Sequence, residues 1–169
     1  IWSPPNQIYH ELRQRLQVRD KLLDMRTQMK NQRHALQQWP VQIPEAQASL
    51  EAVLTELNTQ LKVLEKEIAQ ILKQGEWAES AKLLLATPSI GLVTAAWMLV
   101  GTMNFTIGNS AEQLTAYAGL VPKEHQSGTS VHKRPKIGHT GNKRLRTALY
   151  MASVTAVRCN PTLKAFYER

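Results

Sequence analysis

A serine in a strongly basic, glycine-containing segment is the residue of this chain best suited to covalent chemistry. Ser127 precedes Gly128, which permits unusual backbone angles and leaves little bulk around the hydroxyl. A serine hydroxyl is a weak nucleophile unless a base or a positive field helps it to ionise. Groups that could supply such a field lie on both sides of it: Lys123, His125, His132, Lys133, Arg134 and Lys136. The pattern is compatible with attack on a phosphodiester through a phosphoserine link, although a Ser-Gly pair in a loop more often only forms a turn.

Charge is divided unevenly along the chain. Residues 80–169 contain 11 Lys and Arg against three carboxylates, which accounts for the whole formal net charge of +8, whereas residues 1–79 are neutral overall. A basic half of this kind indicates a phosphate-backbone partner whose binding falls steeply with salt. A merely solvated basic surface is the alternative.

A second group of cations falls in the first turn of a helix expected over about residues 142–159. Lys143, Arg144 and Arg146 oppose the helix dipole there, so their clustering suggests compensation by an external anion. With the N–H groups of the same turn they would form a phosphate cradle. A chance surface cluster is the alternative.

Metal chemistry is less well supported. His125, His132 and His139 are spaced seven residues apart, but the segment has no cysteine and only Glu124 as a nearby carboxylate, so we predict no metal site in it. The absence of any Asp after Asp24 argues against a self-contained two-metal nuclease centre.

Three other reactive side chains are expected to have packing roles. Tyr117 and Tyr150 fall on apolar helical faces, with their hydroxyls expected at the edge. Cys159 is the lone cysteine, which excludes an internal disulfide and fits a reducing compartment.

Two long amphipathic helices are predicted in the first half, over residues 7–38 and 45–74, with breaks at Pro40 and Pro44 between them. In the second helix, apolar residues recur at steps of three and four, which favours a coiled coil: Leu54, Leu57, Leu61, Leu64, Ile68 and Ile71. A heptad-like seam is also expected in the first helix: Leu22, Met25, Met29 and Leu36. We expect an antiparallel hairpin, an oligomerisation seam or both, or else two helices packed on a globular core.

The second half is predicted to consist of shorter helices and one long loop. The helices are expected at about residues 77–86, 92–100, 110–120, 142–159 and 162–168, and the loop at 123–141. The turn that ends at Gly91 has the layout of a helix-hairpin-helix, in which N–H groups at the start of the second helix face a DNA phosphate. Ser89 stands where that hairpin usually has glycine, and a buried helical corner explains the same residues.

The predicted fold class is therefore all-α, with three regions. We expect a linker over residues 1–6, a helical coiled-coil arm over 7–76, and a compact helical domain over 77–169. The start at Ile1, in a proline-containing stretch, suggests a fragment of a longer protein. No apolar run reaches the roughly 18 residues of a membrane span, and no signal peptide is recognisable, so we expect a cytoplasmic, nucleoid-associated protein that does not contact membrane.

Four runs of the second half carry a family resemblance: PSIG at 88–91, QLTAYAGLVP at 113–122, QSG at 126–128 and GNKRLRTALY at 141–150. In this order they resemble the C-terminal domain of bacterial insertion-sequence transposases. The family is the one with an N-terminal RuvC-like domain that carries a DEDD metal-binding set, akin to the Piv-type DNA invertases. The similarity covers about residues 84–169.

The resemblance implies a recombinase that moves a DNA element and uses a noncoding bridge RNA to pair donor and target sites. It implies Ser127 as the nucleophile, with Mg²⁺ held by acids of the RuvC-like domain, which this chain lacks, and no cofactor in the piece itself. It also implies a coiled coil that joins the domains and pairs protomers as a homodimer or homotetramer. The serine of one protomer would then work with the acids of another.

We therefore expect double-stranded DNA and bridge RNA as partners, and strand exchange only when the missing acids are present. Nucleic-acid contact is assigned to these residues: Lys123, His125, His132, Lys133, Arg134, Lys136, His139, Asn142, Lys143, Arg144, Arg146 and Gly91. Two alternatives stay open. One is an architectural DNA-binding module in which Ser127 only shapes a turn, and the other is an assembly domain whose basic face meets RNA or an acidic protein.

Overall fold

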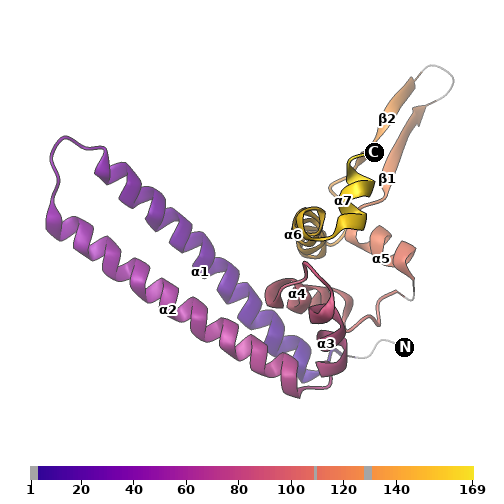
Figure 1. Ribbon diagram of the computed structural model, residues 1–169, viewed down its shortest axis with the longest axis horizontal. Coiled ribbons are helices and arrows are strands. Elements are labelled where there is room, and N and C mark those ends of the chain that lie inside the picture. The colour runs from indigo at the N-terminus through magenta and orange to yellow at the C-terminus, as the bar shows by residue number, and fades with distance from the viewer. Residues whose placement is uncertain (1–3, 109, 128–130) are drawn as a thin grey trace.

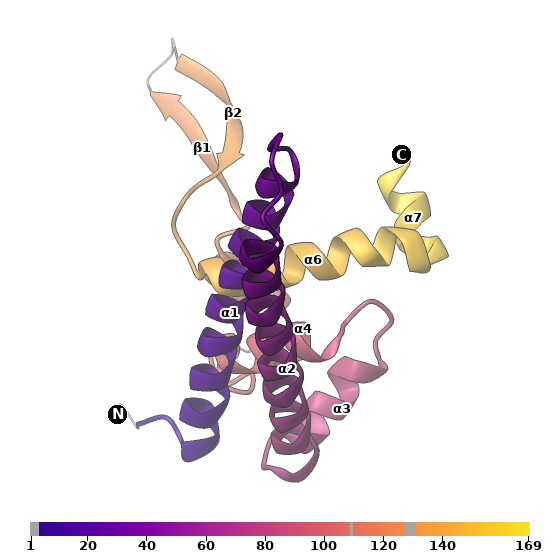
Figure 2. The same ribbon diagram turned by 90° about the vertical axis from the view of Figure 1, so that its left-hand side faces the viewer.

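The computed structural model describes residues 4–108, 110–127 and 131–169. Its first two helices, α1 (Gln7–Gln37) and α2 (Pro44–Gln74), form a long antiparallel arm. The remaining elements are α3 (Ala78–Ala86), α4 (Leu92–Thr102), α5 (Ala111–Ala118), β1 (Pro122–Ser127), β2 (Val131–Ile137), α6 (Lys143–Cys159) and α7 (Pro161–Tyr167). The arm and the β1–β2 hairpin extend away from the shorter helices in different directions (Figures 1 and 2).

The all-α prediction is confirmed, and every predicted helix is present with ends within two residues of those expected. The loop predicted over 123–141 is wrong for most of its length, because residues 122–137 contain a two-stranded antiparallel hairpin. Pro135 was expected to interrupt secondary structure, because proline has no backbone N–H to donate to a neighbouring strand. In a two-stranded sheet both strands are edge strands, where a missing N–H is tolerated. Lys123 pairs with Lys136 and His125 with Lys133, so Pro135 lies in a bulge where the register shifts.

The arm is held by an apolar seam and by ion pairs between its helices. Of the residues predicted on the α2 seam, four are buried, Leu54, Leu57, Leu61 and Ile68. The seam assigned to α1 is wrong at Met25, which is 40% exposed; the buried residues of α1 are Leu12 and Leu16. Along the arm, Arg15 pairs with Glu67, Arg19 with Glu65 and Arg33 with Glu51.

The main core lies at the base of the arm, because only there do α3 and α4 add a second apolar layer. Leu12, Ile68, Trp77 and Leu99 come from α1, α2, the start of α3 and α4, and each is at most 4% exposed. The same helix α4 also contacts α6. A methyl group added at Gly101 would lie 3.4 Å from the Cβ of Leu145, so the two helices approach closely. The helix α4 thus joins the arm to the C-terminal elements.

Two packing predictions for single side chains are wrong. Tyr150 is 65% exposed, and Cys159, the last residue of α6, is also exposed, so neither side chain is part of the core. In the part of the chain that the structure describes, no helix has the length and apolar character needed to cross a bilayer.

Replacing Leu16 with Ala should lower the free energy of unfolding by about 2–5 kcal/mol, because the side chain is 0% exposed in the core and its loss leaves a cavity. Val18, two residues along the same helix, is 51% exposed. Val18→Ala is the matched control and should change stability by less than about 0.5 kcal/mol. Urea unfolding followed by circular dichroism measures both, and equal effects would contradict the position of the core.

Candidate nucleic-acid interface

The predicted nucleophile lies at the far end of the β-hairpin. Ser127 is the last residue of β1 and pairs with Val131, so the segment between them, which includes Gly128, is outside the described residues. The strand register places Gln126 opposite His132. The hairpin therefore gathers the first basic cluster of the sequence on one projecting element.

The structure describes the backbone of this hairpin but only some of its side chains. Four residues predicted to contact nucleic acid have side chains outside the described part, as does Ser127: Lys123, His125, His132 and Lys133. Arg134, Lys136 and His139 are described and exposed. They place positive or ionisable groups from the second strand down to the start of α6.

Two glycines lie against each other at the base of the hairpin, and the backbone geometry there requires glycine at both positions. Gly119 ends α5 with φ +73°, and Gly141 precedes α6 with φ +95°. A Cβ on Gly141 would lie 2.6 Å from the backbone nitrogen of Gly119, and a Cβ on Gly119 would overlap the carbonyl of Thr140. Backbone in this left-handed region is strained for other residues. The two chain segments can approach this closely only because both positions lack a side chain.

Arg146 holds the same junction from the side of α6. Its Nη1 donates to the carbonyl of Thr140 at 3.0 Å and to those of Ala118 at 3.3 Å and Gly119 at 3.5 Å. These carbonyls belong to the end of α5 and to the segment that returns from the hairpin. The guanidinium was predicted to contact nucleic acid, which stays a prediction; in the structure it ties the hairpin to two helices.

The first turn of α6 is capped and anchored by Asn142. Its side-chain oxygen accepts from the N–H of Leu145 at 3.1 Å, and its backbone N–H donates to the carbonyl of Tyr117 at 2.8 Å. Its amide also donates to the Tyr117 hydroxyl at 3.3 Å. Lys143 follows and is exposed. The cap orients this turn relative to α5, while Lys143 faces solvent.

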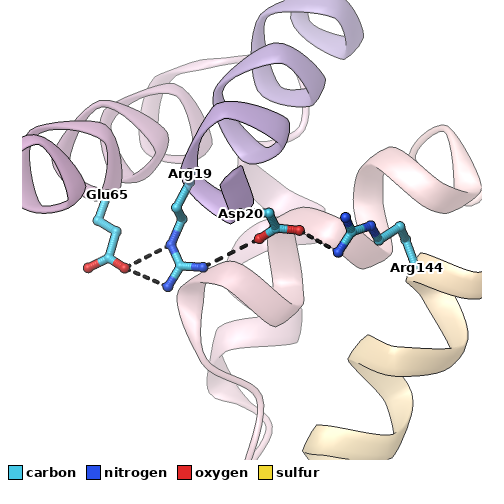
Figure 3. A network of polar contacts seen from close by, with 4 residues as sticks. All are labelled: Arg19, Asp20, Glu65 and Arg144. Atoms are coloured by element: carbon cyan, nitrogen blue, oxygen red, sulfur yellow. Dashed lines mark hydrogen bonds and ion pairs between the residues drawn. The ribbon is translucent and has the colours of Figure 1, made fainter. Parts of the chain in front are cut away.

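Arg144 connects the same turn to the arm. Its Nη1 lies 2.6 Å from the carboxylate of Asp20, and its guanidinium carbon is 5.5 Å from the centre of the Trp97 ring. Asp20 also lies 3.7 Å from Arg19, which pairs with Glu65 at 2.7 Å (Figure 3). Sequence reasoning missed Asp20, because nothing local indicates that it meets a residue more than a hundred positions away.

Gly91 is not brought together with the other predicted contacts. It caps the start of α4 with φ −86°, and a Cβ there would meet no atom within 4 Å. The turn before it, with Ser89 at φ +81°, borders a groove that includes Ala152 and Ala156 of the second half of α6. Lys143 lies at the other end of that helix. The turn between α3 and α4 is therefore separate from the basic first turn of α6, and the predicted helix-hairpin-helix role of this turn stays a prediction.

Glu112, in the first turn of α5, is one of the three acidic residues among residues 80–169, and its pKa is lowered. The Ser110 hydroxyl, which also caps the helix, and the backbone N–H of Glu112 hold the pKa of the Glu112 carboxyl below its ordinary value. Glu112 therefore stays ionised in mildly acid solution, and its negative charge interacts favourably with the positive N-terminal end of the α5 dipole. Among the described side chains, no three His, Cys, Asp or Glu groups converge on one point.

Comparisons with known proteins cover mainly the second half. The family described as "Transposase IS116/IS110/IS902 family" matches residues 81–168. Pilin gene-inverting proteins of Moraxella bovis and Moraxella lacunata are 41% and 46% identical over 90 residues, which is 53% of this chain and 28% of each relative. An uncharacterized 43.6 kDa protein of insertion element IS110 from Streptomyces coelicolor is 31% identical over 121 residues, 72% of this chain and 29% of the relative. The chain thus spans less than a third of each of these relatives.

Replacing Gly119 with Ala should destabilise the chain by at least about 1–3 kcal/mol, because the new methyl is strained at positive φ and overlaps backbone. Gly91→Ala is the control, since the site is open and its φ is ordinary, and should cost at most about 1 kcal/mol for a changed helix cap. Thermal unfolding measures both. A Gly119→Ala chain as stable as Gly91→Ala would disprove the close junction.

Proposed function

Because the chain belongs to the IS116/IS110/IS902 transposase family, we propose that it is the nucleic-acid-binding and strand-transferring part of a DNA transposase. The observation that supports this most is the segregation of all net charge into residues 80–169, the half that the family covers. In that half, the junction of Gly119, Gly141 and Arg146 joins the basic hairpin to the basic first turn of α6. Both would meet one duplex backbone together.

In this proposal, Ser127 is the nucleophile. Its Oγ attacks the phosphorus of a DNA phosphodiester and gives up its proton, while one bond from phosphorus to a deoxyribose oxygen breaks and that oxygen leaves as a hydroxyl. The phosphoserine link conserves the energy of the broken bond. Attack by the hydroxyl of a second strand reverses the step, restores Ser127 and joins the strands without ATP. The surrounding cations stabilise the negative charge that develops on the phosphate.

The position of Ser127 supports this role in two ways. It lies at the end of β1, in a hairpin that projects from the helices in a different direction from the arm. Two glycines and an arginine fix the base of that element relative to α5 and α6.

Further components of the reaction are proposed to come from outside this chain. We propose that Mg²⁺-binding acids are supplied by a RuvC-like domain, and that a bridge RNA selects the DNA sites. The arm would pair protomers into a dimer or tetramer through its helices. The domain division at residues 76 and 77 follows the change from arm to shorter helices.

A non-catalytic module for DNA binding and oligomerisation is the second candidate. Arg144 pairs with Asp20, and Arg146 donates to the carbonyl of Thr140. These contacts within the chain give both arginines a structural role, which favours this second candidate. In that case, Ser127 only ends a strand.

The two candidates are separated by Ser127→Ala in a transposase that carries this chain, assembled with its DNA sites, any guide RNA and Mg²⁺. The first candidate predicts a covalent protein–DNA adduct on a denaturing gel in the wild type and its loss in the variant. Ser130→Ala, a change of the same kind three residues along, should keep the adduct. Equal recombination by wild type and Ser127→Ala would exclude the serine as the nucleophile and support the non-catalytic binding module.

A further inference from the structure

A pocket of about 370 Å³ lies where the arm meets the first turn of α6. Six of its lining residues carry the chemistry: Tyr9, Arg13, Trp97, Tyr117, Asn142 and Arg144. They come from α1, α4, α5 and the start of α6. The volume falls within the roughly 300–1,000 Å³ typical of sites for small ligands. The sequence did not indicate this site, because Tyr9 and Arg13 lie in the electrically neutral half.

The charge of the pocket is one-sided. Arg13 and Arg144 line it, and among the described residues no carboxylate does, although Asp20 lies outside the pocket and pairs with Arg144 at 2.6 Å. The adjacent pocket on the other side of Arg144 is lined by Asp20 and Asp24 as well as by arginines, and the pocket at the base of the arm is lined by Glu11 and Glu76. An anionic group is therefore favoured in the first of these pockets and opposed in the pocket at the base of the arm, while the charges of the pocket beside Arg144 balance.

Both arginines are held in place by aromatic rings. Arg13 Nη1 donates to the Tyr9 hydroxyl at 2.6 Å, and its guanidinium carbon is 5.6 Å from the centre of the Tyr9 ring. Arg144 lies 5.5 Å from the centre of the Trp97 ring. A guanidinium has five N–H donors, and the contacts of both arginines use Nη1. A phosphate can thus be bound without ordering two free side chains first.

The remaining wall suits a planar ring. Tyr117 is 37% exposed, and the Asn142 amide holds its hydroxyl at 3.3 Å. Exposed aromatic rings and arginine planes stack on bases that are out of a duplex, and an asparagine amide can both donate to and accept from a base edge. A base within a paired duplex is stacked on both faces and could not enter.

We propose that this pocket binds one unpaired nucleotide of a nucleic-acid strand held by the chain, with its phosphate at Arg13 and Arg144 and its base against Trp97 and Tyr117. The inference rests on the proposed function and adds a site on the arm to it. The bound nucleotide would fix the register between the strand and the first turn of α6, next to the hairpin that carries Ser127. The same chemistry fits an unpaired nucleotide of DNA or of RNA.

The test uses the 169-residue chain and duplexes that contain one unpaired 2-aminopurine, made in DNA and in RNA, beside fully paired duplexes of the same length. Fluorescence anisotropy gives affinity, and 2-aminopurine emission reports stacking. The wild type should bind the duplex with the unpaired base about tenfold more tightly than the paired one and quench its emission. The series, DNA or RNA, that shows both effects identifies the source of the nucleotide.

The variant Arg13→Ala should bring the two affinities together and remove the quenching, while binding of the paired duplex changes little. Lys30→Ala removes another exposed cation from the same helix outside the pocket and should keep both effects. Circular dichroism checks that each variant is folded. Equal affinity for paired and unpaired duplexes in the wild type, or quenching that survives in Arg13→Ala, would overturn this inference and leave the proposed function intact. Absence of salt-sensitive binding to any of the duplexes would instead overturn the proposed function.

Discussion

The close approach of Gly119 and Gly141 is the constraint on which the C-terminal half depends. Neither position tolerates a side chain, so α5, the returning strand of the hairpin and the start of α6 meet at one point. Arg146 then satisfies carbonyls from both sides of that point. Without the two glycines, the hairpin and α6 would be separate basic elements. With them, the two can present their charges to one partner.

Besides the packing of α4, a mixed polar and aromatic contact couples the arm to the first turn of α6. Arg144 lies between the carboxylate of Asp20 and the ring of Trp97, and Asp20 belongs to the chain of charges that continues through Arg19 to Glu65 (Figure 3). A phosphate that binds Arg144 competes with Asp20 for the same guanidinium. Binding at the first turn of α6 is therefore linked to the attachment of the arm.

The helices could be predicted from the sequence because the signals for them are local. Proline breaks, caps such as Ser110 and apolar steps of three and four residues act within one or two turns. The hairpin could not be predicted, because pairing of two strands depends on residues that are not adjacent in the sequence. Pro135 also indicated a loop rather than a strand. Asp20 and Tyr9 were missed for the same reason: their contacts arise only when α1 packs on α4 and so comes near the first turn of α6. Conversely, Arg146 was predicted from its charge, and its contacts with backbone carbonyls become visible only in three dimensions.

Hydrogen–deuterium exchange of the chain, free and bound to a DNA duplex, shows which backbone amides the duplex covers. If the hairpin and the start of α6 form one nucleic-acid face, the amides of β1, β2 and the first turn of α6 will exchange more slowly in the complex. Those of the far half of the arm, residues 24–50, will be unchanged. Protection confined to the far arm, or protection of α6 without the hairpin, would show that the two elements do not form one nucleic-acid face.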